Sequence, residues 1–336
     1  MLQIRLIGAP KPPGWRHPQV VFDPAIPIDR CDGILSWGAL TPEFLSYRGA
    51  RAWYSSEPVT HLFPLLVGQQ RGRDQVRLFR QARRLLAEHE LLHHSNPNPK
   101  YRVPAVTHYG ELSLAPVGPR TENIVATVND FGNRIWWVRR GVRFRTRFIL
   151  HPSIDLYGAR ESWSRFRRWP WFRPAAPPNY RGPTTAPNCY LPNYIEFLSR
   201  YRICVCLENA CSPYWFTEKF LNAARAGCVP VYYAHPTVRD SFLKGAKWID
   251  PADFRFNVSA TLQAAKECDA ATFRDQNYRW LQNELLKTTE GYAVWSRIAD
   301  LFVEVLAEKS LAGGAVADKR SSTSEGEAAP VTITGA

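Results

Sequence analysis

Short apolar runs alternate with helix-like stretches along most of the chain. Each run has a length typical of a strand, and the order strand, helix, strand predicts parallel sheets with helices on both faces. The expected strands cover residues 4–7, 33–37, 51–55, 123–129, 203–207, 228–233 and 247–250.

The expected helices carry recognisable start and stop signals. Thr41, which stands before a proline, is a typical N-cap residue. Gly227 follows the helix expected at 217–226, at the position where glycine commonly ends a helix. Apolar residues recur at helical spacing in 291–309, and a Leu/Arg-rich helix is expected at 76–94.

The chain of 336 residues exceeds the usual size of one domain, so we expect two doubly wound α/β domains. We place the N-terminal domain at 1–122 and the C-terminal domain at 123–310, with the last helix packing back on the first domain. The proline-rich segment 169–193 is expected to be a loop near the mouth of the second domain. Residues 311–336 lack periodicity, which predicts a disordered tail.

Composition excludes several protein classes. Hydrophobic residues make up 45% and charged residues 22%, unlike disordered or collagen-like chains. No stretch approaches the roughly 20 apolar residues that a membrane helix needs. The seven cysteines show no zinc-like pairing, and Cys204 and Cys206 should share one strand face. Reduced thiols in a cytoplasmic protein fit this usage best.

The net charge of +13 is unevenly distributed. Residues 134–181 contain twelve arginines, no lysine and only two acidic residues, which gives this segment a charge of +10. Such a cluster predicts an anionic partner, such as a phosphate-bearing ligand, a nucleic acid or an acidic membrane surface. The alternative is an ordinary solvated surface, which explains many charge runs.

The segment 201–233 carries the clearest candidate site. An apolar strand ends at Glu208-Asn209, and a helix should start near Glu218 and Lys219. Phosphates bind at such helix N-termini, so Lys219 could meet a diphosphate while Glu218 accepts ribose hydroxyls. Alternatively, Glu218 complements the helix dipole and Lys219 is a surface residue. No glycine-rich fingerprint supports a dinucleotide or P-loop site.

The same segment resembles a known family. The stretch ENACSPYWFTEKFLNAARAGCVPVYYAHP, followed downstream by WID and DF, is similar to the C-terminal signature of the glycosyltransferase family 10 fucosyltransferases. Weaker similarities lie at Asn129-Asp130 and 154–158, and in the aromatic strand that leads to Glu57-Pro58.

The resemblance implies an α/β fold of the GT-B type, with two Rossmann-like domains facing a cleft. It also implies inverting transfer of L-fucose from GDP-fucose to a sugar hydroxyl of a glycan, with O3 of N-acetylglucosamine as the expected position. The expected partners are GDP-fucose and an oligosaccharide acceptor. Peripheral contact with an anionic membrane through the basic segment is a further expectation, and no nucleic acid is expected.

Donor-binding residues follow from the same resemblance. Asn209, Glu218 and Lys219 occupy positions at which the family contacts the GDP-sugar. The family tyrosine three residues before the glutamate is Trp215 here, with Tyr214 beside it. The aromatic hydroxyl contact is therefore lost, moved to Tyr214 or replaced by the indole N–H.

The remaining assignments concern the chemistry. The family's nucleotide-binding arginine corresponds to Arg134 or Arg140, and we favour Arg134 because it precedes an aromatic-rich stretch. Glu57 is the expected general base, and its alternative role is that of a surface carboxylate at a strand end. No acidic metal motif is evident, so cationic side chains should neutralise the departing diphosphate, with neither metal nor cofactor required.

Two other interpretations remain open from the sequence alone. A GT-B transferase could use a different nucleotide sugar, because the helix-start site contacts the diphosphate and ribose more than the hexose. A nucleic-acid-binding protein could use the basic segment 134–181, where aromatic residues are interleaved with arginines. The second interpretation leaves Glu218-Lys219 at a strand–loop–helix junction unexplained.

Overall fold

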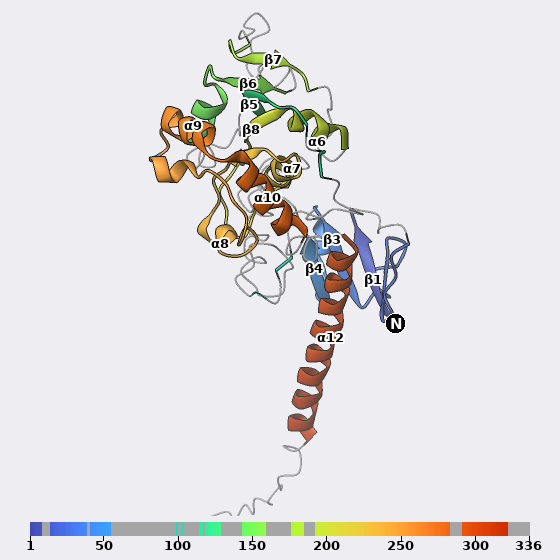
Figure 1. The fold of residues 1–336 in the computed structure, drawn as a ribbon. Coiled ribbons are helices and arrows are strands. Elements are labelled where there is room, and N and C mark those ends of the chain that lie inside the picture. Colours follow the sequence, from blue (N-terminus) through green and yellow to red (C-terminus); the bar gives the residue numbers. More distant parts are fainter. Residues whose placement is uncertain are drawn as a thin grey trace, which may run out of the picture.

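Two separate sheets organise the molecule, and every strand in them pairs in parallel (Figure 1). The α/β class with parallel sheets, predicted from the sequence, is thereby confirmed. The computed structural model describes residues 1–8, 14–38, 41–54, 99, 102–103, 114–116, 118–128, 143–158, 176–184, 192–282 and 291–321.

The first sheet has four strands in the order β2-β1-β3-β4. A short helix, α1, links β3 to β4, and Thr41 caps it because its hydroxyl accepts a hydrogen bond from the Phe44 amide. The elements of this unit are β1 (Leu2–Ile7), β2 (Val20–Asp23), β3 (Gly33–Trp37), α1 (Pro42–Ser46) and β4 (Ala50–Tyr54).

One face of the first sheet is covered by a helix from the other end of the chain, α12 (Gly291–Ser321), as Figure 1 shows. Trp295, Ile298 and Phe302 of this helix are buried against apolar residues of β1 to β4. Gly33 permits the close approach, because a Cβ there would lie 2.8 Å from the Phe302 ring and 2.9 Å from the Ala50 carbonyl oxygen.

The helix α12 continues well past the packed part. It runs to Ser321, so its last turns occupy residues for which the sequence analysis expects a disordered tail. Several of these residues, such as Leu311, Ala315 and Ala317, are helix formers that can extend an existing helix one hydrogen bond at a time. The rest of the expected tail, 322–336, lies outside the described residues.

The second sheet has five strands in the order β7-β6-β5-β8-β9. Residues on alternate sides of its strands enter two different cores, so helices cover both faces. The strands are β5 (Thr121–Thr127), β6 (Ile154–Tyr157), β7 (Tyr180–Gly182), β8 (Tyr201–Val205) and β9 (Val229–Val231).

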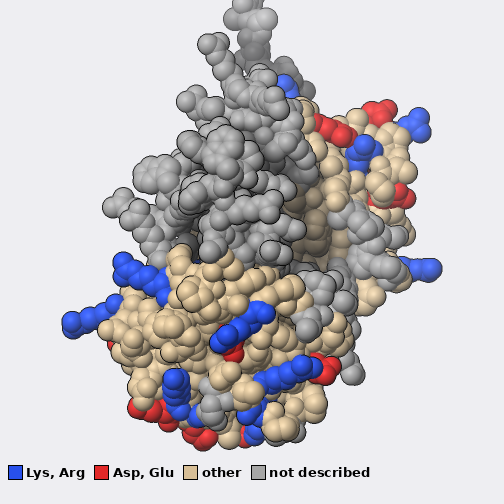
Figure 2. Space-filling model, turned by 90° about the horizontal axis from the view of Figure 1, so that it is seen from above, with Lys and Arg blue, Asp and Glu red and all other residues tan. Residues whose placement is uncertain are grey.

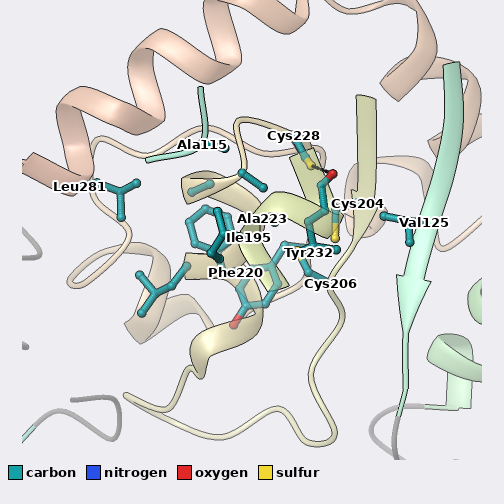
Figure 3. Close-up of a cluster of buried hydrophobic side chains, with 14 of the residues drawn as sticks. Ala115, Val125, Ile195, Cys204, Cys206, Phe220, Ala223, Cys228, Tyr232 and Leu281 are labelled. Atoms are coloured by element: carbon teal, nitrogen blue, oxygen red, sulfur yellow. Dashed lines mark hydrogen bonds between the residues drawn. The ribbon is translucent and has the colours of Figure 1, made fainter. Parts of the chain in front are cut away.

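On one face of the second sheet, α6, α7 and α10 pack over Cys204 and Cys206, which share that face as predicted. Figure 3 shows Phe220 of α7 beside Tyr232, with ring centroids 4.9 Å apart. On the other face, α5 and α9 pack over Ile203. The helices are α5 (Arg143–Ile149), α6 (Pro192–Ser199), α7 (Glu218–Arg225), α8 (Pro236–Arg239), α9 (Val258–Glu267) and α10 (Ala270–Trp280), with a 3₁₀ turn η4 (Pro251–Phe254).

Some of the other elements predicted from the sequence are present in the structure, and others differ or lie outside the described residues. Gly227 follows α7 with a φ of +67°, as expected for a helix C′ glycine. The strand expected at 247–250 is reduced to one bridge between Ile249 and Val231. The helix expected at 76–94 lies outside the described residues. Within the described residues, no helix combines the length and apolar character needed to cross a bilayer.

Candidate functional site

The strand order of the second sheet defines where a ligand would enter. The chain leaves β5 toward β6 and β7, then returns to place β8 on the other side of β5. The carboxyl ends of β5 and β8 therefore diverge at a topological switch point, the place where open parallel sheets bind ligands. The candidate segment 206–219 follows β8 at this point.

A small cavity of about 10 Å³ lies at the switch point. Its walls include Thr127, the last residue of β5, and Val128, which follows it. Leu207, which follows β8, and two cationic side chains, Arg145 and Lys219, also line the cavity. This volume is about what one water molecule needs and is far below that of a nucleotide. The cavity thus marks where positive charge reaches the end of the sheet, next to the start of α7.

Glu208 ties the end of β8 to the start of α7. Its buried carboxylate accepts hydrogen bonds of 2.8 Å from the amide and the hydroxyl of Thr217, and one of 2.9 Å from the Tyr232 hydroxyl. Burial, together with the Glu208 charge, raises the pKa of Tyr232 well above its usual value. Tyr232 therefore stays protonated and donates to Glu208.

Lys219 lies next to Glu208, in the first turn of α7. Its Nζ is 3.4 Å from Glu208 Oε2, 3.3 Å from Glu218 Oε1 and 3.0 Å from the Thr217 hydroxyl. Burial lowers the pKa of Lys219, but the two carboxylates more than offset it, so the net pKa is raised. The side chain keeps 24% exposure and is cationic at neutral pH.

Arg145 brings a second cation from α5, and this one is buried. Its Nε donates to the Leu207 carbonyl oxygen at 3.1 Å, and the residue is 8% exposed. Burial lowers the pKa of Arg145 to about 10, an effect that the negative charge of Glu208 partly opposes. Arg145 thus remains charged at neutral pH, and with Lys219 it balances the two carboxylates Glu208 and Glu218.

The loop between β8 and α7 places its aromatic residues differently. Trp215 is only 4% exposed and belongs to the interior of the loop. Tyr214 is half-buried and has a φ of +55°, a left-handed conformation that is uncommon for a residue with a side chain. Of the two residues offered for the family tyrosine, Tyr214 is therefore the more accessible to a ligand.

The structure brings together part of the predicted donor site. Asn209, Tyr214, Glu218 and Lys219 lie on one loop and helix start, and Thr217 caps the helix by accepting from the Lys219 amide. The predicted base, Glu57, and the two predicted arginines, Arg134 and Arg140, lie outside the described residues.

Sequence reasoning missed Arg145, Glu208 and Thr217 as members of this site. Thr217 carried a usable signal, because threonine before an acidic first turn is typical of an N-cap. Arg145 had no distinguishing sequence signal, since it is one of twelve arginines in 134–181. Only the packing of α5 on the sheet singles it out.

Most of the basic segment 134–181 lies outside the described residues. Within its described parts, Arg145 is buried and Arg181 pairs with Asp155 at 2.7 Å. On the described part of the face in Figure 2, Lys and Arg side chains are spread among uncharged residues and lie near Asp and Glu. Contact with an anionic membrane therefore stays a prediction.

Among the described residues, no three His, Cys, Asp or Glu side chains gather as a metal ion requires.

Comparison with known proteins supports the resemblance over a limited segment. A stretch of 53 residues is 40% identical to Alpha-(1,3)-fucosyltransferase B of Drosophila melanogaster; it covers 16% of this chain and 12% of that protein. The chain thus matches about an eighth of the length of this curated relative. No protein-family model matches the chain.

The solved structures that align with this chain include glycosyltransferases. An α1,3-fucosyltransferase with GDP aligns over 90% of both chains at 14% identity, with a TM-score of 0.41. The DNA-modifying enzyme β-glucosyltransferase aligns over 89% of this chain and 99% of its own at 10% identity, with a TM-score of 0.46. The two parallel sheets described above are the part of the expected GT-B architecture that this structure itself shows.

Proposed function

We propose that the chain is a glycosyltransferase that moves L-fucose from GDP-fucose to a sugar hydroxyl of a glycan. The observation that carries this proposal is the start of α7. There, the buried Arg145 and the partly exposed Lys219 meet a capped helix N-terminus at the switch point of a parallel sheet. The 40% identity to a fucosyltransferase over 53 residues supports the choice of sugar donor.

Donor binding would use the positive end of α7. The N-terminus of a helix carries a partial positive charge and amide groups that suit a diphosphate. Lys219 adds a cation in the first turn, and Glu218 offers a carboxylate to ribose or sugar hydroxyls. Asn209 and Tyr214, half-buried on the same loop, are available to complete the contacts.

Glu208 would keep this surface in place while the donor binds. Its hydrogen bonds to Thr217 fix the first turn of α7, and its charge holds Lys219 at the mouth of the cavity. A diphosphate that approaches Lys219 would compete with Glu208 and Glu218 for the ammonium group. Arg145, and Arg134 or Arg140, would supply further positive charge.

Transfer with inversion needs two kinds of assistance. A general base must take the proton of the acceptor hydroxyl as its oxygen attacks the anomeric carbon, and we assign this role to Glu57. The departing GDP must be stabilised as negative charge develops on the diphosphate, and we assign this role to Lys219, the arginines and the α7 N-terminus. The expected acceptor position is O3 of N-acetylglucosamine.

A donor-selectivity assay tests the proposal. The purified chain is incubated with a small glycan array and GDP-fucose, GDP-mannose or UDP-glucose, and nucleoside diphosphate release and product mass are measured. We expect transfer from GDP-fucose only. Transfer from another donor would keep the glycosyltransferase assignment and refute the sugar, whereas no transfer and no GDP binding would refute the function.

A further inference from the structure

Tyr214 is held in an unusual backbone conformation from the side of the second sheet. Its φ of +55° costs energy for any residue other than glycine, so the surrounding structure must impose it. Its amide donates to the Thr237 hydroxyl at 2.8 Å, and that hydroxyl lies 2.9 Å from His235 Nδ1. The start of α8 thus fixes the backbone of Tyr214 but leaves its ring to be placed by something else.

The ring of Tyr214 contacts an arginine that belongs to the first sheet's unit. The guanidinium carbon of Arg102 lies 3.5 Å from the ring centroid, which is the distance of a close cation–π stack. The next residue, Val103, is 2% exposed and packs in the apolar cluster of β1 to β4 and α12. The Arg102 amide also donates to the Pro99 carbonyl oxygen at 3.2 Å, which closes a turn.

We propose that Arg102 is a positioning residue that couples the first sheet's unit to the donor site through Tyr214. Stacking of the guanidinium fixes the Tyr214 ring three residues before Thr217, the cap of α7. The segment that leads to the helix N-terminus is then fastened on both sides, by Thr237 from the second unit and by Arg102 from the first. This role rests on the proposed function of the α7 N-terminus.

The chemistry of the pair makes the proposal specific. A guanidinium is planar and weakly hydrated, so it can lie flat on an aromatic ring, whereas a lysine ammonium is a compact, strongly hydrated charge. The stack needs the ring of Tyr214 but not its hydroxyl. Arg102→Lys should therefore behave like a loss of the stack, and Tyr214→Phe should leave the hydrogen exchange of residues 209–219 at the wild-type rate.

The first experiment needs no nucleotide. Hydrogen exchange of the full chain is measured by mass spectrometry on peptides that cover residues 209–219, for Arg102→Ala, Arg102→Lys and the wild type. Arg200→Ala is the control, because Arg200 carries the same charge in an exposed pair with Glu196. We expect faster exchange in both Arg102 variants and no change in the control. Unchanged exchange in Arg102→Ala would overturn the proposal.

The second experiment is a double-mutant cycle read by GDP affinity. Tyr214→Asn removes the ring, while asparagine tolerates the left-handed backbone. We expect Arg102→Ala to raise the Kd for GDP by about 3- to 30-fold, the range of a cation–π contact, in the wild-type background. In the Tyr214→Asn background it should have no further effect, because the stack is already gone.

The outcomes separate the two proposals. If Arg102→Ala weakens GDP binding equally in both backgrounds, Arg102 acts independently of Tyr214 and the positioning role is wrong. If the wild type binds no GDP but the exchange result holds, the coupling of the two units stands and the function proposed for the site is wrong.

Discussion

The two sheets of this protein end in very different chemistry. At the carboxyl end of the first sheet, Trp37 stacks on Trp295 with ring centroids 5.3 Å apart and contacts Tyr54 at 4.0 Å. At the corresponding end of the second sheet, the partly exposed Lys219 forms an ion pair with the buried Glu208. The first sheet thus ends in packed rings of its own core, whereas the second ends in charged side chains of the kind that suit a phosphate.

The two sheets also differ in how their cores are assembled. The second sheet draws its cores from residues 115–281 of the chain. The first sheet combines β1 to β4 with Val103 and with Val294 to Phe302 of α12. A mutation in α12 should therefore damage the first sheet and spare the donor site.

The largest effect is expected for Glu57→Gln, which tests whether the first unit supplies the chemistry. The amide cannot accept the acceptor proton, so kcat should fall by about 10²- to 10⁴-fold. GDP affinity should stay unchanged, because the proposed donor site lies in the second unit. Rates from a coupled GDP-release assay and affinities from calorimetry check both parts.

A matched control is Glu196→Gln, the same substitution at an exposed position of α6. It should leave the rate unchanged. Near-normal transfer by Glu57→Gln would remove this residue from the mechanism. Loss of GDP binding as well would mean that Glu57 supports the fold.

Trp295→Ala tests the dependence of the first sheet on α12. Trp295 is 1% exposed and touches the rings of Trp15, Phe22 and Trp37. Its truncation should lower the free energy of unfolding of the first unit by about 3–5 kcal/mol. Thermal melts followed by calorimetry would show this loss, while GDP binding to the second unit should persist.

The matched control on the same helix is Tyr292→Ala, because Tyr292 is 43% exposed. Its loss of stability should be much smaller than that of Trp295→Ala. Equal losses would show that α12 is held by general helix stability and not by the aromatic contacts.

Lys219→Ala tests whether the charged end of the second sheet binds the diphosphate. Removing a charged hydrogen-bond donor should weaken GDP binding by about 1–3 kcal/mol. Lys244→Ala removes the same charge from an exposed position and should have no effect on the affinity. Equal calorimetric affinities for wild type and Lys219→Ala would exclude Lys219 from the donor site.

The smallest effect is expected from metal removal. If Lys219, the arginines and the α7 N-terminus neutralise the leaving group, transfer should continue at its normal rate in EDTA. Initial rates with and without chelator measure this directly. A loss of activity that Mn²⁺ restores would show that a metal performs part of the role assigned to these cations.

Local signals predicted the elements around the donor site well. Apolar runs marked β8 and β9, and Gly227 marked the end of α7, because strand burial and helix capping depend on neighbouring residues. The same holds for Thr41 at α1. These features could be derived from short stretches of sequence without knowledge of the tertiary fold.

Features that depend on distant residues could not be predicted. Arg145 meets the backbone of Leu207 across 62 positions, and its burial depends on how α5 packs. Tyr214 has a left-handed φ, and its contacts with Thr237 and Arg102, which lie far away along the chain, have no local sequence signal. The charge pattern identified 134–181 as basic but could not show which of its arginines is buried in the folded chain.

The return of α12 to the first sheet has a consequence for synthesis on the ribosome. The strands β1 to β4 emerge early, but the rings that cover them, including Trp295 and Phe302, are translated more than 200 positions later. Chains are made at about 5–20 residues per second, so the apolar face of the first sheet waits on the order of ten seconds or more. The second unit can fold during that interval, which would make the N-terminal unit the last to be completed.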